Sequence, residues 1–94
     1  MSKYPETVEE AIRQLKTELG MEGLEKLKQF EEADLIKLHF NLGMGIRNAY
    51  GLWEPQSTLR DNITERTGFV MHVDDMSMYL IKQLWRDLQD NDLE

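Results

Sequence analysis

The stretch LIKLHFNLGMGIRNAYGLW, from Leu35 to Trp53, is apolar around most of a helical circumference. At helical spacing, its apolar and small residues form one stripe, and further large apolar residues lie off that stripe. The stripe comprises Leu35, Leu38, Leu42, Gly45 and Ala49, and the residues off it are Phe40, Met44 and Ile46. A helix with this pattern is usually surrounded by neighbours, so we expect residues 32–50 to form a central helix.

Two glycines interrupt this segment and a third follows it. Gly43 and Gly45 each cost about 1 kcal/mol relative to alanine inside a helix. We expect neighbouring helices to cross closely at both positions, because small residues permit close approach of two backbones. A kink, or a ligand that contacts the backbone, is the alternative. Gly51 fits the left-handed position that ends a helix, and Leu52 and Trp53 are expected to fold back over that end.

Four shorter helices are expected to pack against the central one. The first begins with a capping box at Thr7 and Glu10 and ends at Gly20. The others are expected near residues 21–30, 57–68 and 74–90, and the last is expected to be capped by Asp74 or Asp75. The sequence therefore predicts an all-α bundle of about five helices in one domain, residues 1–94, with frayed ends at 1–6 and 91–94.

Composition excludes several classes of function. The chain of 94 residues has no cysteine, which excludes disulfides, thiolate metal sites and cysteine nucleophiles. No apolar run is long enough for a membrane span and the amino terminus lacks a signal-peptide pattern, so we expect a cytoplasmic protein. The formal charge of −7 disfavours direct binding of nucleic acid and is compatible with a basic protein partner. A charge of this size also keeps a small protein soluble without any further role.

Two motifs resemble a family of small uncharacterised bacterial domains. They are HFNLGMGIRNAYGLW, from His39 to Trp53, and HVDDMSMYLIKQLW, from His72 to Trp85. The family pattern reads His-Phe-x-Leu-Gly-x-x-Ile-Arg-Asn-x-x-Gly-Leu-Trp, then a loop, then Asp-Asp-x-Ser and a helix ending in Leu-Trp. The chain departs from it at 58–67, which predict a regular polar helix. The resemblance implies a compact domain of bacterial or phage origin and transfers no activity.

Six polar residues of these motifs form a candidate cluster. They are His39, Arg47, Asn48, Asp74, Asp75 and Ser77. Because His39 and Arg47 are eight residues apart, they share a helical face, and Arg47 can pair with Asp74 or Asp75 if the last helix begins beside them. We interpret the cluster as a structural tie between two helices, since buried polar groups need partners. The alternative is a polar pocket that binds a ligand or a substrate.

No pattern typical of catalysis or metal binding is present. An enzyme without a cofactor needs a nucleophile beside a base, or an acid and a base in one cleft. His39, His72, Ser57 and Ser77 are the candidate groups, and none has a partner at a diagnostic spacing. The set His72-x-Asp74-Asp75 is a weak pattern for metal ligands, and no glycine-rich phosphate loop occurs. We therefore expect no enzymatic activity, no cofactor and no metal.

The last predicted helix offers a candidate surface for a protein partner. Met78 and Tyr79 lie away from its apolar stripe, and Asp87 and Asp90 follow on the same helix. Methionine and tyrosine side chains are common in adaptable interfaces, and carboxylates suit a partner with a basic rim. This surface would bind a protein without catalysis.

The predicted function is a non-catalytic acidic protein-binding module. It would be a small regulator or inhibitor that acts by occupying the surface of a partner protein, without direct contact to nucleic acid or membrane. Two alternatives stay open. One is a ligand-binding or enzymatic domain with a polar pocket around His39, Arg47, Asn48 and Asp74. The other is self-association through an exposed helix face.

Overall fold

A computed structural model describes residues 4–90, and these residues form α-helices and no strand. The α-helices are α1 (Val8–Lys28), α2 (Met44–Ala49), α3 (Thr58–Thr67) and α4 (Val73–Asp90). A 3-10 helix η1 (Glu32–Leu38) and a π-helix η2 (His39–Gly43) lead into α2. The all-α prediction is confirmed for this part of the chain, and none of its helices has the length and apolarity to cross a bilayer. The predicted tail and the first three residues of the lead-in lie outside the described residues.

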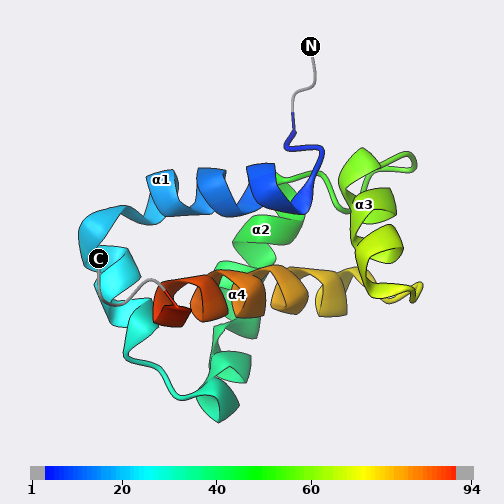
Figure 1. Cartoon of the computed structure of the whole chain (residues 1–94). Coiled ribbons are helices and arrows are strands. Elements are labelled where there is room, and N and C mark those ends of the chain that lie inside the picture. Colours follow the sequence, from blue (N-terminus) through cyan, green and yellow to red (C-terminus); the bar gives the residue numbers. More distant parts are fainter. Residues whose placement is uncertain (1–3, 91–94) are drawn as a thin grey trace.

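The centre of the fold is α4, and the prediction of a central helix at 32–50 is wrong. α4 contacts α1, α2, α3, η1 and η2, and it runs beside α1 while α2 crosses behind both (Figure 1). The buried residues of α4 are Met76, Ser77, Leu80, Ile81 and Leu84. Segment 32–50 has one side open to solvent, where the Phe40 side chain is 74% exposed. Apolar residues around most of the helical circumference of 32–50 therefore did not mean that every side of this segment is buried.

Segment 32–50 also changes its winding twice, in place of the single α-helix predicted. It begins as η1, widens into η2 and continues as α2. Because 3-10 and π turns have different numbers of residues per turn, side chains move out of the 3.6-residue register. The predicted close crossing is confirmed at Gly43, where an added Cβ atom would lie 3.5 Å from Ser77 Oγ of α4. It is wrong at Gly45, where an added Cβ atom would meet no atom within 4 Å.

The first two predicted helices are the two halves of α1, which meet at a kink at Gly20. The Thr7 hydroxyl accepts a hydrogen bond from the Glu10 N–H at 3.1 Å, as a cap should. The Glu10 carboxylate, however, accepts from the Glu6 N–H at 2.9 Å, which is not the reciprocal bond of a capping box. At Gly20 the backbone has φ 68° and ψ 177°, and the helix turns there before continuing (Figure 1). This backbone conformation is not helical and favours glycine, so the first helical segment ends at Gly20 as predicted and a second one follows it.

The turn after α2 follows the prediction only in part. Gly51 has φ 70°, and an added Cβ atom would lie 2.6 Å from the ring of Tyr4, so both its conformation and its space require glycine. Leu52 is fully buried beneath this turn. The Trp53 side chain is 55% exposed, which corrects the expectation that it covers the helix end. Its ring lies edge-on to His72, with 6.4 Å between ring centroids.

The cap of α3 is as predicted, and the cap of α4 is not. Ser57 caps α3 by accepting from the Arg60 N–H at 3.1 Å, and α3 ends at Gly68 as expected. The prediction that Asp74 or Asp75 caps α4 is wrong. Helix α4 begins earlier, at Val73, and His72 Nδ1 accepts the Asp74 N–H at 3.1 Å. The two aspartates therefore lie within the first turn, where they still favour the positive end of the helix dipole.

Candidate functional site

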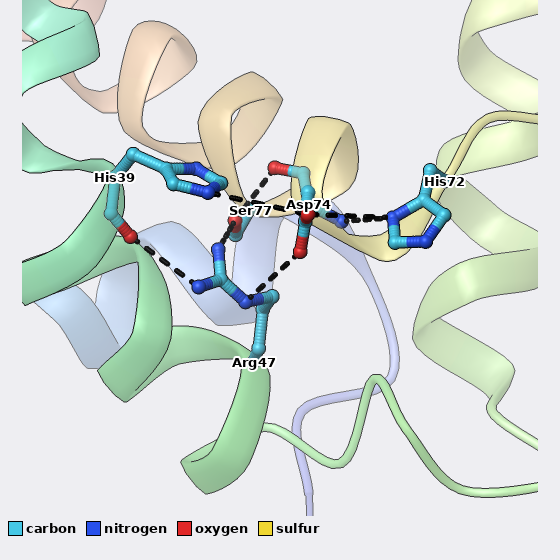
Figure 2. A network of polar contacts seen from close by, with 5 residues as sticks. All are labelled: His39, Arg47, His72, Asp74 and Ser77. Atoms are coloured by element: carbon cyan, nitrogen blue, oxygen red, sulfur yellow. Dashed lines mark hydrogen bonds and ion pairs between the residues drawn. The ribbon is translucent and has the colours of Figure 1, made fainter.

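Arg47 lies at the contact between α2 and α4 and is 4% exposed. Its Nη1 donates to Ser77 Oγ at 2.9 Å, and its Nη2 donates to the His39 carbonyl at 3.4 Å. Its Nε lies 3.4 Å from Asp74 Oδ1. Figure 2 shows the guanidinium reaching all three partners at once. The fork of donors on a guanidinium suits this task, and the predicted pairing with Asp74 is confirmed.

The backbone around Arg47 makes room for its side chain. An added Cβ atom at Gly43 would lie 3.2 Å from Arg47 Nη1 and 3.5 Å from Ser77 Oγ, so glycine keeps this space open. Ser77 is fully buried, and its hydroxyl also donates to the Asp74 carbonyl at 2.8 Å. The Ser77 hydroxyl thus accepts one hydrogen bond and donates another. The local structure satisfies each polar atom that it buries here.

Asp74 joins this buried contact to the surface. Its side chain is 42% exposed, and its Oδ2 lies 3.7 Å from His72 Nδ1 and 4.0 Å from His39 Nε2. The two imidazoles lie on opposite sides of the carboxylate (Figure 2). Both separations exceed an ordinary hydrogen bond, and each contact is ionic only when the imidazole is protonated. Oδ1 therefore serves the buried arginine, while Oδ2 lies between the two imidazoles.

Two residues of the predicted cluster lie apart from it. Asn48 and Asp75 are exposed, and neither hydrogen-bonds nor pairs with Arg47. Each directly follows a residue that points into the cluster, and a single helical step turns a side chain by about 100°. The sequence placed them on the correct helices but not on the correct face.

The cluster is closed and not hollow. Within residues 4–90, no buried side-chain nitrogen or oxygen lacks a hydrogen-bond partner. A hollow of about 630 Å³ lies between α3 and the segment that leads into α4, and its lining includes His72 and Met76 but neither Arg47 nor Asp74. In the same described part of the chain, no group of three histidine, cysteine or acidic side chains is placed to hold a metal ion. The arrangement ties α2 and η2 to α4.

The four residues of the predicted partner surface on α4 do not form one exposed surface. Met78 and Tyr79 are partly buried against the core, and the Tyr79 hydroxyl contributes to the raised pKa of Arg66 through a hydrogen bond. Asp87 forms an ion pair with Lys16 of α1, and Asp90 is exposed at the end of α4. The sequence pattern of α4 predicted that these side chains lie off its apolar stripe, but it could not predict their contacts with Lys16 of α1 and Arg66 of α3.

Sequence reasoning missed a second surface, which carries large exposed side chains. Ile36, Phe40 and Met44 follow one another at intervals of four residues along η1, η2 and α2, and all three are exposed. The ring of Phe40 lies edge-on to that of His39, with 4.9 Å between centroids. The available signal was that Phe40 and Met44 lie off the main apolar stripe of their segment.

Four pairwise contacts link five side chains, which we call the aromatic ledge. It consists of Phe40, His39, Asp74, His72 and Trp53, in that order. Its members come from η2, from the start of α4 and from the turn after α2. An exposed aromatic ring stands at each end, and a carboxylate lies in the middle.

Comparison with known proteins gives a family and no activity. Residues 4–88 match the family described as a domain of unknown function, DUF6794. No curated protein and no solved structure matches this chain. Both motifs singled out in the sequence lie inside the matched range, which covers nearly the whole chain. The chain therefore belongs to the DUF6794 family, whose function is unknown.

Proposed function

We propose that this protein is a non-catalytic, acidic protein-binding module of bacterial or phage origin. It acts in the cytoplasm as a small regulator or inhibitor by occupying the surface of a partner protein. The observation that carries this proposal is the row of exposed apolar side chains at Ile36, Phe40 and Met44. Soluble monomers rarely expose large contiguous apolar surface, and such surface marks contact sites.

The placement of this row supports a protein contact. All three side chains belong to one stretch of nine residues, so a partner that binds along this segment can contact each of them. Burial of a large apolar side chain stabilises a contact by about 1.5–3 kcal/mol. Phe40, the most exposed aromatic residue of the described chain at 74%, is the expected anchor.

The competing function, a ligand or substrate pocket around His39, Arg47, Asn48 and Asp74, has lost its geometric support. The guanidinium of Arg47 is already used within the protein, because it binds Asp74, Ser77 and the His39 carbonyl. Its fourth member, Asn48, is exposed on another face. We therefore assign Arg47 to the folding of α2 onto α4 and the outer surface to recognition.

The test is recovery of the partner from the native host. The tagged protein is purified at low and at moderate salt, and proteins that accompany it are identified by mass spectrometry. We expect a stoichiometric protein that is retained by Met21→Ala and lost from Phe40→Ala. Met21 is the matched control, because it is 87% exposed and lies on α1. A partnerless monomer that carries a bound small molecule would overturn the proposal.

A further inference from the structure

We propose that two hollows beside Met71 form a docking groove for a basic amphipathic helix of the partner protein. This inference rests on the proposed function and names the chemistry of the partner segment. The first hollow, of about 630 Å³, lies between α3 and the segment that leads into α4. The second, of about 410 Å³, lies between η1 and α4. Met71 lines both hollows, so they adjoin at its side chain, and we call the pair the Met71 groove.

Apolar side chains line both halves of the Met71 groove. Val70, Val73 and Met76 line the first hollow, and Ile36 and Met78 are among the residues that line the second. Val70 is 89% exposed and Ile36 is 63% exposed, so a partner can reach an apolar side chain in each half. Methionine side chains are flexible and adapt to the shape of the side chains that they contact. The groove therefore suits the apolar face of a partner helix.

The Met71 groove is continuous with the exposed row that carries the proposed function. Ile36 begins that row and also lines the second hollow. A partner that contacts Ile36 thus meets the row and the groove at the same residue. The groove adds apolar contact area next to the row, which by itself offers only three side chains.

Carboxylates border both hollows and are free to pair with a partner. Asp61 and Glu65 line the first hollow, and Asp75 lines the second. All three residues are exposed. Within residues 4–90, no side chain forms an ion pair or a hydrogen bond with any of these carboxylates. Their charge is therefore available to lysine or arginine side chains that flank the apolar face of a partner helix.

The arginine and the lysine that line the groove are already engaged. Arg60 donates hydrogen bonds to the carbonyls of Leu52 and Pro55, at 2.9 and 3.0 Å. Lys82 pairs with Glu32 at 3.3 Å. The described lining thus offers unpaired negative charge beside apolar surface, which is the complement of a basic amphipathic helix. The formal charge of −7 on the whole chain opposes a second copy of this chain as the occupant.

The direct test is a nuclear magnetic resonance titration of the ¹⁵N-labelled full chain. The probe is the end-blocked peptide KLLKKLLKKLLK, whose leucines fall on one face when it is helical. One control peptide has glutamate in place of every lysine, and the other has serine in place of every leucine. We expect saturable shifts at the backbone amides of Ile36, Val70, Met71 and Met78. Each control should bind at least about tenfold more weakly, because it lacks either the charge or the apolar face.

Variants of exposed apolar residues show whether the peptide occupies the groove. Ile36→Ser and Val70→Ser should each weaken binding of the basic peptide by about fivefold to tenfold, because one apolar contact is lost. Met21→Ser is the matched control and should leave the affinity unchanged. All three positions are exposed, so a dispersed spectrum is expected for every variant. Full binding by both Ile36→Ser and Val70→Ser would overturn the inference.

A pair of charge variants separates the groove from the net charge of the chain. The double variant Asp61→Asn, Glu65→Gln should weaken binding of the basic peptide by about threefold at low salt. The matched control is Glu22→Gln, Glu25→Gln, which changes the net charge equally at exposed positions of α1. It should have a smaller effect. An equal loss in both double variants would show that only net charge attracts the peptide, and would overturn the inference.

The outcome can be separated from that of the proposed function. If the basic peptide binds no better than its controls, or shifts amides away from the groove, while Phe40→Ala still loses a partner in the host, the basic helix is wrong and the protein-binding function stands. If the peptide fails and no host protein depends on Phe40, both fail. Shifts at the groove that grow with protein concentration in the absence of peptide would identify a second copy as the occupant and would overturn the inference.

Discussion

Replacement of Arg47 by methionine is expected to destabilise the fold strongly. Methionine keeps an unbranched apolar stem in the buried space and removes all three polar contacts of the guanidinium. These are the hydrogen bonds to Ser77 Oγ and to the His39 carbonyl, and the ion pair with Asp74. The variant therefore isolates the tie between α2 and α4.

The expected cost follows from the burial of each partner. Breaking a fully buried ion pair costs about 3–5 kcal/mol, and a hydrogen bond to a charged group contributes about 1.5–3 kcal/mol. Asp74 is 42% exposed, so water can solvate its carboxylate after the substitution, and the ionic part must be discounted. Ser77 keeps its hydrogen bond to the Asp74 carbonyl. We expect a loss of about 2 kcal/mol, or about 8–16 °C in Tm for a domain of this size.

The assay is thermal and urea unfolding followed by circular dichroism. Asn48→Ala is the matched control, because Asn48 is the next residue in the same helix and is exposed. Its stability should stay within about 0.5 kcal/mol of the wild type. An Arg47→Met variant with an unchanged Tm would refute the structural role of Arg47 and would favour a role in binding a ligand or partner.

Four further substitutions test the glycine positions, the buried Tyr50 hydroxyl and the cap of α3. Gly45→Ala should stabilise α2 by about 0.5–1 kcal/mol, because an added Cβ atom meets nothing within 4 Å. Gly43→Ala should stabilise less or destabilise, because its Cβ atom would crowd the hydrogen bond between Arg47 and Ser77. The urea midpoints of the two variants give the comparison. Burial raises the pKa of Tyr50, aided by the nearby Glu18 carboxylate, so the unfolded chain releases this proton first and stability should fall as pH rises above about 10. Tyr50→Phe should show a shallower decline above about pH 10 in the same unfolding assay. Ser57→Ala should cost about 1 kcal/mol, since the cap of α3 is lost, and an unchanged midpoint would show that the cap contributes nothing.

Local signals in the sequence predicted the boundaries of several elements. Thr7 and Ser57 cap helices because a side-chain oxygen satisfies an orphan N–H in each first turn. Gly51 and Gly68 adopt the positive φ that ends α2 and α3. The pairing of Arg47 with Asp74 was also predictable, because a buried guanidinium needs an anionic or polar partner and the second motif supplies one.

Longer-range features could not be read from the sequence. The winding of 32–50 as 3-10, then π, then α turns depends on its packing against α4, which periodicity does not describe. Phe40 and Trp53 were assigned to the interior because large apolar side chains are mostly buried, yet both are exposed. His72 was considered as a catalytic group and as a metal ligand, although its place before α4 allowed the capping role that it has.

The measurement that tests the central claim most directly is photocrosslinking in the native host. The photoreactive residue benzoylphenylalanine replaces Phe40 in one variant and Met21 in another, since both positions are exposed and lie on different elements. The account predicts a covalent adduct with one partner protein from position 40 and none from position 21. Adducts from both positions alike, or an adduct from position 40 that contains only a second copy of this chain, would contradict it.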